Sequence, residues 1–153
     1  MELSIGDILT AERTLIDVEV SSKKKLLEFL AGFVAGQLKD CSADDIFDSL
    51  LSRERLGSTG IGEGIAIPHC RLEGLDHVVG VLMTLEESVE FDAIDNQPVD
   101  LIFALIVPKE ATSEHLELLS QLAEKFNERS FCDRLRQSED ASTLYQRMTA
   151  SGG

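Results

Sequence analysis

Apolar residues recur at helical spacing in two stretches near the start of the chain. Between residues 23 and 38 they return every three or four positions, which predicts an amphipathic helix. Its apolar positions are Leu26, Leu27, Leu30, Phe33, Val34 and Leu38. A second amphipathic helix is predicted from Ser42, which suits an N-cap, to about Arg55, with Gly57 as a natural stop. The three lysines at 23–25 are interpreted as a solvated face.

Strand patterns lie before, between and after these helices. Residues 14–20 alternate in polarity and are rich in β-branched side chains, which predicts a strand. Residues 78–85 and a shorter piece at 89–91 are further candidates. The run V-D-L-I-F-A-L-I-V at residues 99–107 is apolar almost throughout. Such a run is typical of a strand that is covered on both faces.

Further helices are predicted before the first strand and after the apolar run, where helical periodicity returns. They cover a short turn at residues 5–9, a helix capped by Thr112 or Ser113, a short segment at 131–135 and a last helix at 139–148. The mixture of elements and the two-sided strand predict an α/β fold. We expect a three-layer sandwich in which a mixed β-sheet is flanked by helices on both faces. Residues 1–150 are predicted to form one domain, followed by a flexible tail at 151–153.

Composition narrows the possible partners and compartments. The chain has 153 residues and a formal net charge of -14. Such an acidic chain repels phosphate backbones, so nucleic-acid binding is not expected, whereas encounter with a basic protein is favoured. The three cysteines are widely spaced, which fits a reducing compartment. No signal peptide is visible and no apolar run is long enough to span a bilayer, so we expect a cytoplasmic protein without direct membrane insertion.

The most unusual stretch is G-I-G-E-G-I-A-I-P-H-C-R at residues 60–71. Its spacing fits neither a P-loop nor a dinucleotide-binding fingerprint. Gly60, Gly62 and Gly64 allow positive φ and close approach of another group to backbone N–H donors. Pro68 favours an extended backbone at the residue before it, so His69 follows a conformationally restricted segment.

Three side chains from separate parts of the chain suggest a reaction. An imidazole such as that of His69 is nucleophilic and largely neutral at pH 7. Arg53 offers a planar, permanently charged fork for phosphate. His115 lies in the first turn of a predicted helix, where the positive dipole end favours a neutral imidazole and attracts anions. Together with the glycine-rich backbone, these are the parts that phosphoryl transfer through a phosphohistidine requires.

Two segments of the sequence resemble a known family. The segment S-R-E-R-L-G-S-T-G-I-G-E-G-I-A-I-P-H at residues 52–69 is similar to the active-site signature of the mannitol/fructose-type EIIA domains of the phosphoenolpyruvate phosphotransferase system. Residues 108–123 resemble that family's second motif. The resemblance implies that His69 accepts the phosphoryl group, that Arg53 neutralises charge and that His115 hydrogen-bonds at the site. From the residues themselves, the backbone of Gly60, Gly62 and Gly64 is predicted to add N–H donors to the phosphate site, and neither a cofactor nor a metal is expected.

The opening M-E-L-S-I-G-D-I-L and the stand-alone length resemble the nitrogen-related branch of this family. That branch implies a regulatory phosphocarrier that receives its phosphoryl group from an HPr-like protein, such as the HPr paralogue NPr. Its state would be read by target proteins such as potassium-transport regulators. In a sugar-specific EIIA the group would pass to an EIIB instead.

Three other interpretations stay open from the residues alone. A metal site could use His69, Cys70, His77 and His115, although their spacing follows no standard pattern. Cys70 could act as a nucleophile with a histidine base. A non-enzymatic binding domain, in which His69 is structural, differs from the carrier in one observable, which is the phosphorylation of His69.

Overall fold

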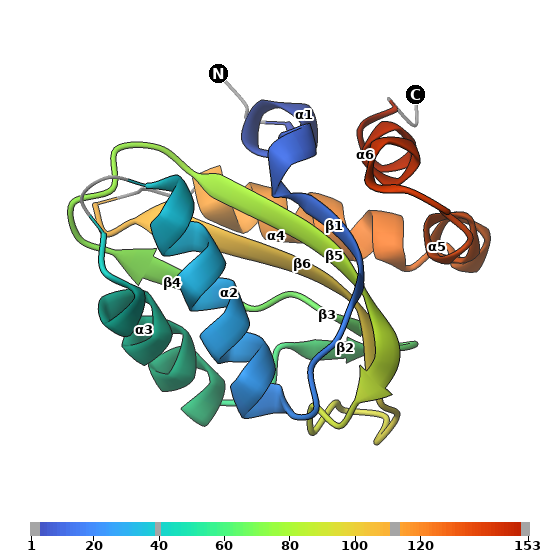
Figure 1. Ribbon diagram of the computed structural model, residues 1–153, viewed down its shortest axis with the longest axis horizontal. Helices are drawn as coiled ribbons and strands as arrows, with labels where there is room; N and C mark the ends of the chain where they lie inside the picture. The colour runs from blue at the N-terminus through green and yellow to red at the C-terminus, as the bar shows by residue number, and fades with distance from the viewer. Residues whose placement is uncertain (1–3, 39–40, 111–113, 151–153) are drawn as a thin grey trace.

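A six-stranded mixed sheet forms the middle of the molecule (Figure 1). This computed structural model describes residues 4–38, 41–110 and 114–150, without the side chains of residues 114 and 115. The strands follow the order β1-β5-β6-β3-β2, and β4 also pairs with β6. They are β1 (Thr14–Val18), β2 (Gly60–Gly62), β3 (Ile65–Ala66), β4 (His69–Leu72), β5 (Val79–Val89) and β6 (Val99–Pro108).

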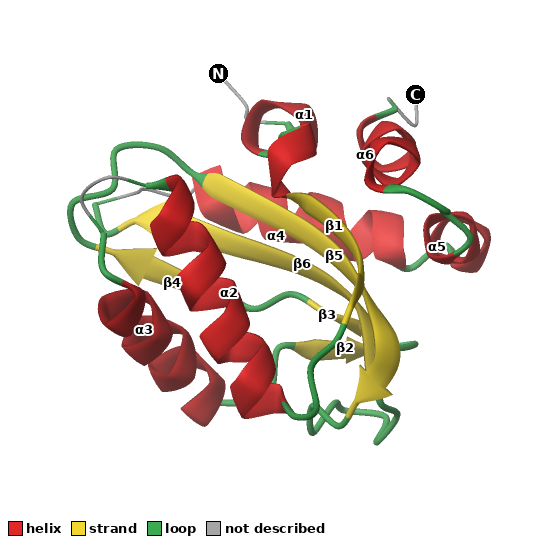
Figure 2. Ribbon diagram, viewed as in Figure 1, coloured by secondary structure: helices red, strands yellow, loops and turns green. Residues whose placement is uncertain are grey.

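Helices cover both faces of this sheet (Figure 2). The helices α2 (Lys23–Gln37) and α3 (Ala43–Arg55) pack on one face. The other face is covered by α1 (Ile5–Ile8), α4 (Glu114–Phe126), α5 (Arg129–Arg136) and α6 (Ala141–Thr149). The predicted three-layer α/β sandwich with a mixed sheet is therefore confirmed.

The apolar run of β6 explains why two layers of helices are needed. Side chains alternate along a strand, so Ile102, Ala104 and Ile106 join the core beneath α2 and α3. Leu101, Phe103 and Leu105 join the core beneath the other helices. All six are completely buried.

The strands β3 and β4 run one after the other along the same edge of β6. Ile65 pairs with Leu101, and His69 pairs with Leu105, so both parallel strands keep the same offset along β6. The two are separated at Pro68, which has no N–H to donate, while its carbonyl still accepts from Leu105 N at 2.9 Å. β6 thereby fixes the position of His69.

Several local predictions hold and others need correction. Ser42 caps α3 and accepts from Asp45 N at 3.1 Å, as its position predicts. In place of the two strand pieces predicted at 78–85 and 89–91, the structure has one long strand, β5, which ends at Val89 and leaves residues 90 and 91 outside it. The short strands β2 and β3 were not predicted, because a glycine-rich run of this length has no clear periodicity. The proposed caps Thr112 and Ser113 lie outside the described residues.

No helix among the described residues combines the length and the apolar character that crossing a bilayer requires.

The burial of β6 on both faces can be tested by truncating neighbouring residues. Ile102→Ala and Phe103→Ala should each lower the free energy of unfolding, by about 2–5 and 3–5 kcal/mol respectively, because each leaves a cavity in a different core. Ile94, which is 85% exposed, is the matched control, and Ile94→Ala should change stability by about 0.5 kcal/mol at most. Urea denaturation measures all three. A strand with one solvent-facing side would show a large loss for only one of the two β6 variants.

Candidate functional site

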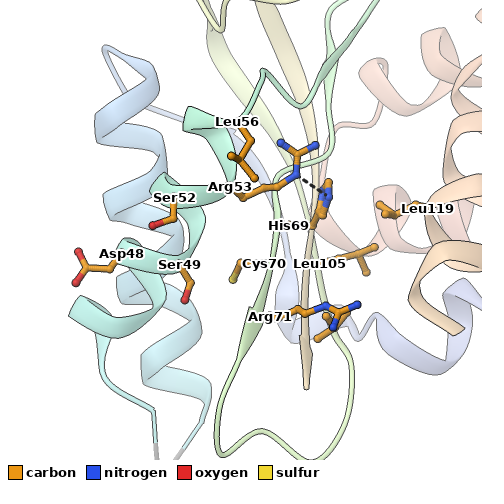
Figure 3. A pocket seen from close by; sticks show the side chains of 11 residues that line it. Asp48, Ser49, Ser52, Arg53, Leu56, His69, Cys70, Arg71, Leu105 and Leu119 are labelled. Carbon is orange, nitrogen blue, oxygen red and sulfur yellow. Dashed lines mark hydrogen bonds between the residues drawn. The ribbon is translucent and has the colours of Figure 1, made fainter. Parts of the chain in front are cut away.

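A cavity of about 480 Å³ opens at the edge of the sheet, beside β4. Its walls come from α3, β4, β6 and α4 (Figure 3). The lining residues are Asp48, Ser49, Ser52, Arg53, Leu56, His69, Cys70, Arg71, Leu105, Val107 and Leu119. Two of the sequence-predicted residues, Arg53 and His69, are therefore brought together although they come from different elements.

The two ring nitrogens of His69 have different partners. Nδ1 lies 2.8 Å from the carbonyl oxygen of Ile67, and Nε2 lies 3.2 Å from Nε of Arg53. A carbonyl oxygen only accepts and a guanidinium N–H only donates. Nδ1 therefore carries the proton and donates to Ile67, while Nε2 accepts from Arg53 through its lone pair. We assign His69 as the neutral tautomer with Nε2 unprotonated on the basis of these partners.

Arg53 is fixed by a second hydrogen bond. It lies in the last turn of α3, and its Nη1 donates to the carbonyl oxygen of Gly57 at 2.9 Å. The guanidinium is thus held at one end by the loop that follows the helix and at the other by His69 (Figure 3). A planar cation held in this way can meet phosphate oxygens without losing much side-chain freedom on binding.

Arg71 is a second cationic residue of the cavity and is not among the site residues predicted from the sequence. It lies two residues after His69 on β4. Since alternate residues of a strand share a face, the i, i+2 relation to His69 was the signal in the sequence that could have identified it. Asp48 is the acidic residue of the same lining.

His115 lies in the first turn of α4, as the sequence predicts. It precedes Leu119, a cavity-lining residue, by one helical turn, so the two positions share a face of the helix. The described residues do not include the side chain of His115. Its contribution to the site stays a prediction.

Gly60, Gly62 and Gly64 lie in the β2–β3 hairpin and are not among the residues that line the cavity. Gly62 and Gly64 have positive φ, at 101° and 80°. A side chain at Gly60 would meet Cβ of Ala93 at 2.8 Å. The structure therefore gives these glycines a role in the tight folding of the hairpin, and a backbone phosphate site there stays a prediction.

Cys70 faces away from His69. Its side chain belongs to the core beneath α2 and α3, and burial raises the pKa of its thiol to about 12. A thiol in that environment is protonated at neutral pH and is a poor nucleophile. The geometry therefore disfavours the interpretation in which Cys70 attacks a substrate.

In the part of the chain that the structure describes, the side chains considered as metal ligands are not gathered around one point. His77 is exposed on the loop before β5, and its Nδ1 lies 2.6 Å from Oδ1 of Asp76. This hydrogen bond lowers the pKa of Asp76. Within the described residues, no three His, Cys, Asp or Glu side chains are placed to hold a metal ion.

Comparison with known proteins adds independent information. The sequence model of the family "Phosphoenolpyruvate-dependent sugar phosphotransferase system, EIIA 2" matches residues 7–151. A nitrogen regulatory protein of Pseudomonas aeruginosa is 48% identical over 144 residues, which are 94% of this chain and 94% of the relative. The crystal structure of the nitrogen regulatory protein IIA-Ntr from Neisseria meningitidis superimposes with a TM-score of 0.90 at 43% identity, covering 95% of this chain and 99% of that one.

The fold is also shared with a more distant protein. The complex of enzyme IIAMTL and phosphorylated enzyme IIBMTL from Escherichia coli gives a TM-score of 0.75 at 18% identity, covering 93% of this chain and 97% of the matched one. At this identity the similarity concerns the fold alone.

The inertness of Cys70 can be tested by alkylation of the folded chain. Iodoacetamide at pH 8 should modify the half-buried Cys41 well before the buried Cys70 and Cys132, because a raised pKa and burial both suppress thiolate attack. Peptide mass spectrometry measures the extent of modification at each cysteine over time. Denatured protein, in which all three should react, is the control. Modification of Cys70 in the native chain at the rate of Cys41 would contradict the assignment.

The hairpin role of Gly64 can be separated from its backbone conformation by a matched pair of variants. Gly64 and Gly74 both have positive φ, but only at Gly64 would a Cβ meet neighbours, namely Arg136 at 2.7 Å and Asp100 at 3.0 Å. Gly74→Ala should cost about 1–2 kcal/mol from φ alone. Gly64→Ala should cost roughly a further 1–3 kcal/mol from crowding. Urea denaturation measures both; equal losses would show that Arg136 and Asp100 yield without cost.

Proposed function

The chain belongs to the EIIA 2 family of the phosphoenolpyruvate-dependent sugar phosphotransferase system, and from this premise we propose that it is a phosphocarrier that accepts a phosphoryl group on Nε2 of His69. The single observation that carries this proposal is the unequal hydrogen bonding of the imidazole. Nδ1 donates to Ile67 and Nε2 presents a lone pair toward Arg53. A nucleophilic nitrogen and the cation that would receive phosphoryl oxygens are thus adjacent.

The proposed reaction is a transfer between two imidazoles. The lone pair on Nε2 attacks the phosphorus of a phosphohistidine on the donor protein. The P–N bond of the donor breaks, and its electron pair returns to the donor nitrogen. His69 has no proton to lose from Nε2, so the step needs no protein base. The carbonyl of Ile67 holds the Nδ1 proton and stabilises the positive charge that the ring gains.

Arg53 has two roles in this proposal. Before transfer, it orients the ring through the 3.2 Å contact with Nε2. During transfer, its guanidinium would exchange that contact for the oxygens of the phosphoryl group and reduce the repulsion between donor and acceptor. His115 is proposed to hydrogen-bond at the same site, because its position on α4 lies one turn from the cavity.

The proposed donor is an HPr-like phosphocarrier in the cytoplasm, and for the nitrogen-related branch its paralogue NPr. The net charge of -14 favours encounter with a basic donor surface. The relative from Pseudomonas aeruginosa is named a nitrogen regulatory protein, which supports a regulatory output. In that output, target proteins such as regulators of potassium transport would read the phosphorylation state.

A second candidate is a sugar-specific EIIA that passes the group to an EIIB. It is favoured by the name of the family, which refers to sugar transport. The two candidates share the chemistry at His69 and differ in the acceptor that follows. Transfer from the phosphorylated chain to a purified EIIB at a catalytically useful rate would favour the sugar-specific candidate.

Phosphorylation of His69 is the prediction that tests the proposal directly. Incubation with phosphoenolpyruvate, enzyme I and HPr or NPr should add about 80 Da, the mass of one phosphoryl group, in an acid-labile form. Intact-mass spectrometry measures the gain, and ¹⁵N NMR identifies Nε2 as the phosphorylated nitrogen. Faster labelling by NPr than by HPr would support the nitrogen-related branch.

Two variants provide the controls for this experiment. His69→Ala should remain folded and gain no mass. Arg53→Ala should still be labelled, but about 10²–10³ times more slowly, because one preorganised charge-stabilising group is lost. A folded wild-type chain that gains no mass from either donor would leave the binding-domain interpretation in its place.

A further inference from the structure

We propose that the buried ion pair between Lys23 and Glu54 is a positioning unit that sets the orientation of both His69 and Arg53. Nζ of Lys23 lies 2.8 Å from Oε2 of Glu54; the Lys23 side chain is 20% exposed and the Glu54 side chain 3%. The consequence for transfer rates rests on the proposed function, whereas the consequence for ring orientation does not.

The ion pair joins two helices at the end nearest the site. Lys23 is the first residue of α2, and Glu54 is in the last turn of α3, immediately after Arg53. The interpretation of Lys23 as part of a solvated face is therefore wrong. Its ammonium group also donates to the carbonyl oxygen of Phe91 at 3.3 Å and lies 4.6 Å from the centroid of that ring.

A continuous hydrogen-bonded path leads from the ion pair to His69. The carboxylate of Glu54 accepts from the backbone N of Thr59 at 3.2 Å and from the Thr59 hydroxyl. The carbonyl oxygen of Thr59 accepts from Ile67 N at 3.0 Å. The carbonyl oxygen of Ile67 then accepts from Nδ1 of His69 at 2.8 Å. The same peptide segment that fixes the His69 tautomer is thus anchored to Glu54.

A second branch leads to Arg53. Gly57 N donates to the backbone carbonyl of Glu54 at 3.1 Å, and the carbonyl of Gly57 accepts from Nη1 of Arg53. Ser58 Oγ donates to the Phe91 carbonyl at 2.7 Å, the oxygen that Lys23 also contacts. The loop that holds the guanidinium is therefore attached to the backbone of Glu54 and to the Phe91 carbonyl that Lys23 also contacts.

The negative charge of Glu54 suits this position for a physical reason. An ionised carboxylate accepts several hydrogen bonds at once, and here it receives the Thr59 amide, the Thr59 hydroxyl and the Lys23 ammonium. Buried ion pairs often add little net stability compared with apolar packing. What the pair supplies is a fixed geometry for the loop at 57–60 and, through it, for the two site residues.

The experiment measures ring geometry and transfer in the same full-length variants. Lys23→Met, Glu54→Gln and the double variant Lys23→Met/Glu54→Gln remove the ion pair, and Lys23→Arg retains it. Glu73→Gln is the matched control, because it removes the exposed ion pair with Lys109, at 3.5 Å. ¹⁵N NMR of histidine-labelled, unphosphorylated protein reports the fraction of His69 with the proton on Nδ1. Intact-mass spectrometry reports the phosphorylation rate.

We expect Lys23→Met and Glu54→Gln to lower the Nδ1-protonated fraction and to slow phosphorylation by about 10- to 100-fold, the cost of a small misplacement of reacting groups. The double variant should be no slower than the slower single variant, since all three changes break one path. Lys23→Arg and Glu73→Gln should stay within about twofold of wild type. If Lys23→Met does not fold, the double variant, which leaves no buried charge unpaired, supplies the same comparison.

Two results would overturn the proposal: an unchanged His69 tautomer in folded Glu54→Gln, or a phosphorylation rate in that variant within about twofold of wild type. A wild-type chain that is not phosphorylated at all would contradict the proposed function instead. In that case the NMR measurement alone decides whether the ion pair orients His69.

Discussion

The parallel pairing of β4 with β6 is the constraint on which the site depends. β6 is buried on both faces, so its register is fixed by two separate cores. β3 and β4 pair with β6 in the same register offset. The position of His69 opposite Leu105 therefore depends on the sheet and not on the surface loops. The pairing with β6 places the imidazole rigidly. Because β4 lies at the edge of the sheet, the ring can still be reached from the cavity between α3 and α4. The phosphoryl transfer that we propose for His69 needs both properties.

The chemistry then depends on a difference between two atoms of one ring. The Ile67 carbonyl and the Arg53 guanidinium impose opposite hydrogen-bonding roles on Nδ1 and Nε2. Ile67 comes from the peptide that precedes Pro68, and Arg53 comes from the end of a helix that packs beside β4. The tautomer is thus determined by the relative position of α3 and the sheet edge. This relation makes the packing of α3 part of the site.

Much of the fold follows from the sequence, because periodicity depends on local side chains. Periodicity predicted the helices α2 and α3 and the two-sided strand β6. The sequence motif predicted that Arg53 and His69 belong to the same site. The strands β2 and β3 escaped prediction because three- and two-residue strands carry no period. Lys23 was interpreted wrongly because its partner, Glu54, belongs to another helix, and the His69 tautomer depends on the position of a carbonyl that no spacing reveals.

The net charge of the chain and the charges that line the cavity act at different distances from His69. The net charge of -14 acts over the distance at which a partner approaches and therefore influences encounter. At the cavity, however, Arg53 and Arg71 are among the residues that share the lining with His69. Over a few ångströms these local cations outweigh distant carboxylates, which salt screens within about 10 Å. In the proposed function, an acidic chain could therefore attract a basic donor and still receive a dianionic phosphoryl group, because Arg53 and Arg71 line the cavity together with His69.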